Sequence, residues 1–228
     1  MSVSIQIVLS KKLFLRDPEQ TELGRRIVDS SIKLIDELGF EKFTFKKLAN
    51  AIGSTEASIY RYFENKHKML IYLVSWYWSW LEYLIDYQTH NIESARRQLE
   101  ITIRVLANSS TYDPNFSHID EVALHRIVVA ESSKAFLTKN VDGENEEGLF
   151  QGYKSLANKL ADLIRELDSG YPNPRALSVV VIETSRNQMF FSKHLPSLTE
   201  IKLDGNDKSP LVDFLRKLMF SVLDCKGE

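Results

Sequence analysis

The sequence predicts an all-α fold. Most of the chain carries apolar residues three or four positions apart, the spacing of a helix that buries one face. Only 9 Gly and 6 Pro interrupt the 228 residues, and the chain lacks the alternation of strands and helices that predicts a parallel sheet. With 43% hydrophobic and 26% charged residues, the composition is typical of a globular chain of one large or two modest domains.

The first residues are the exception to this pattern. Val3, Ile5, Ile7 and Leu9 alternate with polar residues, as in a strand. A lone strand is unstable in water, so the segment either packs on the body of the protein, pairs with a partner chain or stays a loose arm. Residues 1–17 are therefore separated as an N-terminal extension or arm.

The first helix is expected to open at Asp17 and Pro18 and to end at Gly39. Asp can cap free backbone N–H groups, Pro is tolerated in a first turn, and Gly adopts the left-handed conformation that closes a helix. The residues expected on its apolar face are Leu23, Ile27, Ser31, Leu34 and Leu38.

Two short helices and a long one follow. A Thr or Asn precedes each, where its side chain can accept a hydrogen bond from the first turn. The expected spans are 45–52 after Thr44, 56–63 after Thr55 and 66 to about 87 after Asn65, with Gly53 ending the first. Helices of about eight residues are too short to be stable alone. A short pair held by its neighbours has the anatomy of a helix-turn-helix, whose second helix enters the major groove of DNA.

Five further helices are expected in the rest of the chain. Their approximate spans are 91–109, 116–138, 147–168, 174–194 and 209–224. Turn-forming sequences separate them, namely Asp113–Asn115, an acidic solvated loop at 142–147, Tyr171–Pro174 and the longest loop at 196–210.

Charge is distributed unevenly along the chain. The net charge of −2 argues weakly against a nucleic-acid partner. Residues 1–66 hold 11 basic and 9 acidic side chains, whereas residues 67–228 hold 18 and 22. Residues 42–68 contain six basic and two acidic residues, which gives this segment a net charge of +4. Lys66, His67 and Lys68 crowd a first helical turn, where the dipole favours an anion, so either a phosphate binds there or the turn is a solvated basic surface.

The residues from Gly39 to Lys66 resemble the TetR family of bacterial repressors. The similarity rests on the segments 39–40, 44–49, 52–55 and 59–66 and on their spacings, and it covers roughly residues 24–72. It implies an N-terminal three-helix DNA-binding domain at 18–66 and a larger helical ligand-binding and dimerisation domain at 67–228. It also implies a repressor that binds a palindromic double-stranded DNA operator as a homodimer and is released by a small molecule.

The same resemblance implies roles for individual residues. Tyr60 and Lys66 would bind phosphates, and Thr44 would cap its helix and approach the DNA backbone. The full DNA-binding set is Thr44, Phe45, Lys46, Ser54, Thr55, Glu56, Ala57, Ser58, Tyr60, Arg61, Tyr62 and Lys66, with residues 55–58 facing the bases. Two positions depart from the family, which usually has an apolar residue in place of Ser54 and often has Gly in place of Ala57.

Several basic and polar residues also have a structural explanation. Glu56 could accept a hydrogen bond from cytosine, yet a Glu in a first turn stabilises the helix dipole without any DNA, and this second role is preferred. Tyr60 could merely pack, although its hydroxyl would then need a partner. The cations at 11, 12 and 16 either guide the extension towards DNA or are simply solvated, and the solvated alternative is preferred.

An aromatic cluster marks the start of the larger domain, since all three Trp residues lie within 76–80. Rings on several faces of one helix either pack against neighbouring helices or line an apolar pocket whose polar atoms orient a small molecule. The candidate ligand-binding residues are Trp76, Trp80, Tyr83, Tyr87 and His125. His118, Glu121 and His125 have a spacing compatible with a metal ion, but no further ligand is identifiable, so neither a metal nor a cofactor is expected.

The last two helices carry apolar stripes wider than one packing face requires. We expect them to be buried both against their own domain and against a partner, in an intersubunit four-helix bundle. The candidate dimerisation residues are Leu177, Val181, Phe191, Leu211, Phe214, Leu218 and Val222.

The remaining features concern location and alternative functions. No run of 18 apolar residues and no secretory signal is recognisable, and Cys225 is the single cysteine, so a cytoplasmic protein without a membrane partner is expected. A small helical enzyme and a helical protein-interaction adaptor are the alternatives. An enzyme needs a nucleophile–base pair or a metal cluster, which the sequence does not reveal, and an adaptor would use the basic patch to bind an acidic protein.

Overall fold

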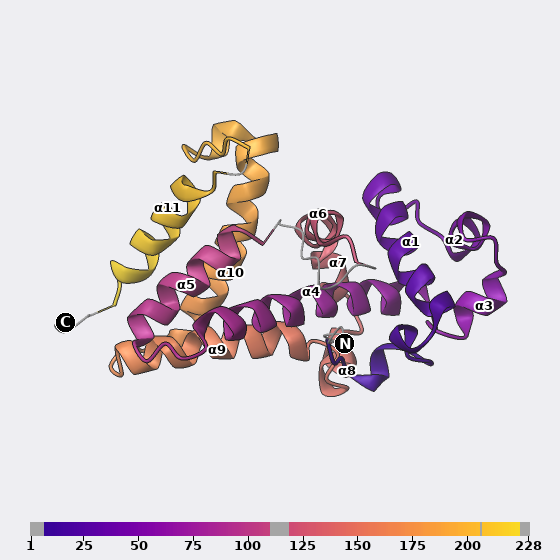
Figure 1. Ribbon diagram of the computed structural model, residues 1–228, viewed down its shortest axis with the longest axis horizontal. Coiled ribbons are helices and arrows are strands. Elements are labelled where there is room, and N and C mark those ends of the chain that lie inside the picture. Colours follow the sequence, from indigo (N-terminus) through magenta and orange to yellow (C-terminus); the bar gives the residue numbers. More distant parts are fainter. Residues whose placement is uncertain (1–6, 110–118, 206, 224–228) are drawn as a thin grey trace. The chain divides into compact units, whose positions relative to one another are not determined.

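The computed structural model describes residues 7–109, 119–205 and 207–223, and this part of the chain is helical (Figure 1). It contains no strand within these ranges, and its β-type pairing is an isolated bridge between Asp204 and Asp207. The all-α prediction is confirmed.

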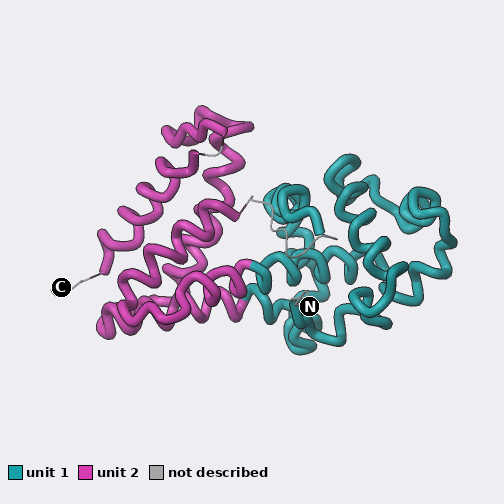
Figure 2. The backbone as a smooth tube through the Cα atoms, viewed as in Figure 1, with its two compact units in different colours: residues 1–80, 110–153 teal, residues 81–109, 154–228 magenta. Residues whose placement is uncertain are grey.

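The chain divides into two compact units (Figure 2). Unit 1 comprises Met1–Trp80 and Ser110–Tyr153, and unit 2 comprises Leu81–Ser109 and Lys154–Glu228. Two helices, α4 (Lys66–Thr89) and α9 (Gln151–Leu167), contribute residues to both units. The functional division into 1–17, 18–66 and 67–228 stays a prediction.

The N-terminal extension is packed on unit 1 from residue 7 onward. It contains one 3-10 turn, η1 (Lys11–Leu13), and a second, η2 (Pro18–Gln20), follows directly after it. Leu13 is only 2% exposed, so the packed alternative holds for this stretch, while Val3 and Ile5 lie outside the described residues. Residues 7–10 form no regular element, contrary to the expected strand.

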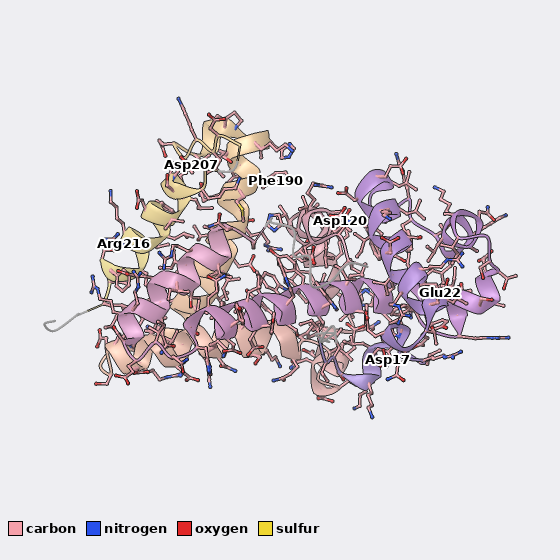
Figure 3. The ribbon with its side chains drawn as sticks, viewed as in Figure 1. Asp17, Glu22, Asp120, Phe190, Asp207 and Arg216 are labelled. Atoms are coloured by element: carbon pink, nitrogen blue, oxygen red, sulfur yellow. The ribbon has the colours of Figure 1, made fainter. Side chains whose placement is uncertain are left out.

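The first helix begins later than predicted. Asp17 caps η2, and α1 (Glu22–Leu38) has Thr21 as its N-cap, whose Oγ1 accepts a hydrogen bond from the N–H of Gly24 at 2.9 Å. Figure 3 labels Asp17 and Glu22, which mark the two starts. The prediction was wrong because both Asp17 and Thr21 are good caps, and the sequence alone does not say which one begins the longer helix. Gly39 ends α1 as expected and has a positive φ of 77°, although its ψ of 154° lies outside the left-handed helical region.

The helix-turn-helix lies between α1 and α4. It consists of α2 (Phe45–Ala51) and α3 (Glu56–Tyr60), and the predicted caps are confirmed: Thr44, Thr55 and Asn65 each accept a hydrogen bond from a first-turn N–H. Gly53, at φ of 60°, separates the two helices. Arg26 of α1 donates to the carbonyl of Ile52 and so ties the end of α2 to α1. The short helices are therefore held by their neighbours.

The rest of unit 1 differs from the prediction in two places. The expected helix at 116–138 is broken into α6 (Glu121–Glu131), capped by Asp120, and α7 (Ser133–Phe136), with residues 110–118 outside the described part. The expected acidic loop is instead the short helix α8 (Val141–Glu146). Glu144 of α8 is only 7% exposed, because it pairs with His67 of α4.

Unit 2 is built from the rest of the helices. These are α5 (Ala95–Ala107), most of α9, α10 (Pro174–His194), the 3-10 turn η4 (Pro196–Leu198) and α11 (Ser209–Phe220). The helices α5, α10 and α11 pack against one another (Figure 1). The bounds of α10 match the prediction, whereas α11 ends earlier than expected, at Phe220. Cys225 lies outside the described residues.

Candidate nucleic-acid interface

Helix α3 presents a polar face to solvent. Thr55, Glu56 and Ala57 are exposed and Ser58 is half-buried, whereas Ile59 is fully buried. Thr55 both caps the helix through the N–H of Ser58, at 3.2 Å, and contacts the hydroxyl of Ser58 at 2.9 Å. One side of α3 thus anchors the helix in the domain, and the side predicted to face the bases is open.

Further predicted contact residues surround α3. Tyr60 is 48% exposed, and its ring packs edge-on against that of Phe45 with centroids 5.0 Å apart. This contact fixes the ring and leaves the exposed side of the residue open to a ligand. Thr44, Lys46 and Arg61 are exposed, and Ser54 is half-buried.

Two residues of the predicted set belong to the core instead. Phe45 is 5% exposed and Tyr62 is 2% exposed. The hydroxyl of Tyr62 forms a 2.7 Å hydrogen bond with that of Thr21, so the polar end of the ring has an internal partner. Tyr62 lies in the turn after α3, which ends at Tyr60, and Phe45 is the first residue of α2; both side chains are buried.

Lys66, predicted to bind a phosphate, has intramolecular partners. Its Nζ lies 3.2, 3.3 and 3.4 Å from the carbonyl oxygens of Phe40, Glu41 and Phe43 and 4.7 Å from the centroid of the Phe40 ring. The ammonium group therefore turns away from the positive end of the α4 dipole and towards three carbonyl dipoles. It holds the turn at 39–43, which leads from α1 into α2.

The same turn is held from α6 and α7. Oε1 of Glu131 accepts a hydrogen bond from the N–H of Phe40 at 3.1 Å. Lys134 pairs with Glu131 at 2.8 Å and with Glu41 at 2.9 Å, and it holds the pKa of Glu41 below its usual value. These contacts connect residues about 90 positions apart, so helical periodicity gave no sign of them.

A bidentate ion pair reinforces this connection. Arg126 of α6 donates to both carboxylate oxygens of Asp36 of α1, at 2.8 and 2.6 Å, and this hydrogen bonding raises the pKa of Arg126. Because both side chains are partly exposed, the pair adds little to the free energy of unfolding, and its main effect is to fix the orientation of the two side chains. Helix α6 is thereby fastened to α1 and to the turn that precedes the helix-turn-helix.

His67 and Lys68, at the start of α4, also have partners within the protein. His67 Nε2 lies 2.9 Å from Glu144 Oε1, and Lys68 Nζ lies 3.2 Å from Glu147 Oε2. The first turn of α4, which the sequence offered as a phosphate site, is thus neutralised by the acidic segment around α8. The acidic segment was expected to be solvated because sequence gives no indication that it folds back onto α4.

The aromatic cluster is largely a buried one. Trp76 and Trp80 are 2% and 0% exposed and stack with centroids 6.2 Å apart. The hydroxyl of Tyr77 forms a 2.7 Å hydrogen bond with Nδ1 of His125, which is 6% exposed. A polar pair is thereby placed among apolar rings, and Tyr77 is a candidate that the predicted set omitted.

Two tyrosines of the predicted ligand set lie in unit 2. Tyr83 is half-buried and Tyr87 is 72% exposed, with ring centroids 6.3 Å apart. An exposed ring at the end of α4 does not line a buried pocket, so Tyr87 is not supported as a ligand-binding residue. His118, a member of the possible metal-binding set, lies outside the described residues. Among the described residues, no group of three or more His, Cys, Asp or Glu side chains could hold a metal ion.

The predicted dimerisation residues fall into two groups. Leu177, Val181 and Leu211 are buried within unit 2, Phe191 and Leu218 are half-buried, and Phe214 and Val222 are 40% and 45% exposed. The first three therefore hold α10 and α11 in their own unit. Two further residues on α10 are exposed and apolar, Val179 at 37% and Val180 at 47%. Exposed apolar residues of unit 2 thus occur on α10, on α11 and just beyond the end of α11.

Comparison with known proteins identifies the N-terminal segment. Residues 27–73 match the sequence model of a family described as bacterial regulatory proteins, tetR family. No curated protein matches the chain. None of the helices in the described ranges has both the length and the apolar character required to span a bilayer.

Several solved structures share the fold. A protein described as a TetR-family transcriptional regulator from Syntrophomonas wolfei is 15% identical, with a TM-score of 0.63 over 88% of this chain and 95% of that one. The fatty acid degradation regulator FadR from Bacillus halodurans is 19% identical, with a TM-score of 0.59 over 87% and 98%. AibR, solved with isovaleryl coenzyme A and operator DNA, is 17% identical, with a TM-score of 0.58 over 87% and 100%.

These likenesses extend across both units, whereas the matched family segment is confined to the region of α1 to α4. At such low identity, the solved structures establish the fold of the chain and not its ligand. Residues 27–73 thus match the tetR family of bacterial regulatory proteins, and the chain shares its fold with solved structures over most of its length.

Proposed function

We propose that this protein is a transcriptional repressor that binds a palindromic DNA operator as a homodimer and is released by a small molecule. The observation that carries the proposal is α3, whose exposed residues Thr55, Glu56 and Ala57 stand on a helix anchored by the buried Ile59. A recognition helix needs this combination of an open polar face and a fixed orientation. We infer a regulator acting in the cytoplasm rather than an enzyme, because the family matched by residues 27–73 is described as regulatory proteins.

The proposed DNA contacts follow the exposure of the side chains. Residues 55–58 would face base edges in the major groove, and Tyr60, with its ring held by Phe45, would donate its hydroxyl to a phosphate. Thr44, Lys46, Ser54 and Arg61 would complete the contacts to the backbone. Phe45 and Tyr62 are left out because they are buried, and Lys66 is assigned to support of the 39–43 turn.

The proposed dimer uses the face of α10 and α11 that unit 2 leaves open. Val180, Phe214 and Val222 are each at least 40% exposed, and Val179 and Leu218 flank them. Pairing this face with a second copy would form a four-helix bundle. Two copies of α3 would then enter successive major grooves, about 34 Å apart for half-sites one turn away.

The proposed effector site is the aromatic cluster on α4 and α6. Tyr77 and His125 would orient a small molecule among the rings of Trp76 and Trp80. The helix that carries His125 also carries Arg126 and Glu131, which hold α1 and the 39–43 turn. An effector with different affinities for two positions of α6 would therefore change the helix-turn-helix. Because AibR was solved with isovaleryl coenzyme A, short acyl-coenzyme A thioesters are the first compounds to test.

A matched pair of tyrosine variants tests the DNA-binding surface. Tyr60→Phe keeps the packing on Phe45 but removes the hydroxyl, and about 1.5 kcal/mol for a hydrogen bond to a charged group predicts roughly tenfold weaker binding per half-site. Tyr87→Phe removes the hydroxyl of an exposed tyrosine in unit 2, and this variant should bind DNA like the wild type. The assay is a gel shift with the DNA upstream of the protein's own gene. A folded wild-type dimer that fails to bind this DNA at low salt would contradict the proposal.

A further inference from the structure

The N-terminal strap, residues 7–21, lies against the end of the recognition segment. We propose that this strap is a second DNA-binding element, in which Lys11, Lys12 and Arg16 bind backbone phosphates beside the half-site read by α3. The inference rests on the proposed DNA-binding function, and the experiment below separates the two.

The strap is fixed to the turn that follows α3. The N–H of Leu15 donates to the carbonyl of Tyr62 at 2.8 Å, and the hydroxyl of Tyr62 bonds to that of Thr21 at 2.7 Å. Leu13 is buried, and the ring of Phe14 packs edge-on against Tyr72 with centroids 6.2 Å apart. Both halves of the strap are therefore anchored, and the segment is not a loose arm.

The anchors place a cation next to α3. The guanidinium carbon of Arg16 lies 5.5 Å from the centroid of the Tyr62 ring, and Tyr62 is two positions beyond Tyr60, the last residue of α3. Arg61, between them, is exposed. Since phosphates line both sides of the groove that a recognition helix enters, a cation at the end of that helix is placed to reach the backbone.

The three cations are exposed and have no internal anion. None of Lys11, Lys12 and Arg16 forms an ion pair with another described residue. The two carboxylates nearest in sequence have other partners: Asp17 caps η2 at 2.9 Å, and Glu19 accepts a hydrogen bond from the hydroxyl of Tyr72 at 3.2 Å. By contrast, Lys66, His67 and Lys68 are all engaged within the protein. The strap thus offers the cationic surface that the start of α4 does not.

A charge-removal experiment measures this contribution. The triple variant Lys11→Gln, Lys12→Gln, Arg16→Gln is compared with a control that removes three exposed cations elsewhere, Lys139→Gln, Lys193→Gln and Lys202→Gln. Each phosphate contact contributes about 0.9 to the slope of log affinity against log salt, so the strap variant should lose about 2 to 3 per half-site. The control should keep the wild-type slope, and so should a third variant that retains the charges, Lys11→Arg, Lys12→Arg, Arg16→Lys.

The outcomes separate the strap from the recognition helix. Binding by the wild type with equal slopes for the strap variant and the control, both shown to be folded by circular dichroism, overturns the inference and leaves the proposed function intact. Loss of slope in the strap variant, together with loss of footprint protection at phosphates outside the half-site, supports the inference. Failure of the wild type to bind DNA at low salt overturns both.

Discussion

Lys66 gives the sharpest test of how the recognition domain is held together. The resemblance to the TetR family implies that Lys66 binds a phosphate. In the structure, its ammonium group lies 3.2–3.4 Å from three backbone carbonyl oxygens of the 39–43 turn. Lys66→Met keeps the length of the side chain but removes the charge and all three donors. If the turn depends on these bonds, the variant should lose stability, and DNA affinity should fall only because the helix-turn-helix is less well held.

The size of the effect follows from the contacts. A hydrogen bond from a charged group contributes about 1.5–3 kcal/mol when buried, but this site is half-buried and water can replace the ammonium group, so about 1–3 kcal/mol in total is expected. For a chain of this size, each kcal/mol shifts the Tm by about 2–4 °C, which gives a fall of roughly 2–12 °C. The salt slope of DNA binding should not change, because no phosphate contact is lost.

Lys46→Met is the matched control. Lys46 is exposed on α2 and belongs to the proposed phosphate contacts, so this variant should keep the wild-type Tm and lose about 0.9 in salt slope per half-site. Thermal unfolding by circular dichroism and fluorescence anisotropy at several salt concentrations give both quantities. A Lys66→Met protein with an unchanged Tm and a slope lowered by about 0.9 would refute the reasoning and restore the phosphate role.

Two further predictions concern the junction of the strap with α1. A Gly→Ala substitution inside a helix ordinarily stabilises the folded protein by about 1 kcal/mol. Gly143→Ala should have this effect, because a Cβ at Gly143 would have no atom within 4 Å. A Cβ at Gly24, by contrast, would lie 2.6 Å from Pro18 Cα. Gly24→Ala should therefore lower the Tm, and a stabilised variant would contradict the contact. Burial, aided by Glu19, raises the pKa of Tyr72 well above about 10. Because the pKa is higher in the folded state than in the unfolded state, this stability is present below about pH 10 and is lost as the pH rises, so Tyr72→Phe should flatten the alkaline decline of the free energy of unfolding. An unchanged decline in urea titrations above that pH would argue against a titrating Tyr72.

Local signals in the sequence were reliable where one residue decides the structure. Thr44, Thr55 and Asn65 cap the helices that they were expected to cap, and Gly39 and Gly53 have the positive φ expected of them. Caps and glycines act through the nearest backbone groups, so sequence alone predicts them. Where two caps compete, as Asp17 and Thr21 do, the sequence does not decide.

Signals that depend on distant partners were misread. A solvated loop was expected at 142–147, but Val141–Glu146 form a helix, and Glu144 and Glu147 bond to His67 and Lys68 of α4. Tyr62 was counted as a DNA contact but is buried beside Thr21. In each case a charged group or a hydroxyl bonds to a residue far away in the sequence, and the spacing of apolar residues does not predict such contacts.

By itself, the sequence determined the helical class, the helix-turn-helix and the resemblance of its residues to a DNA-binding family, because short-range spacing encodes all three. Only the tertiary structure decided which cations are available to a phosphate. The basic residues at the start of α4 bond to carbonyls and carboxylates of the protein, while the three cations of the strap remain exposed and one of them, Arg16, lies beside Tyr62. A count of charges along the sequence treats every cation alike, whereas in the folded protein some cations are paired and others are exposed to solvent.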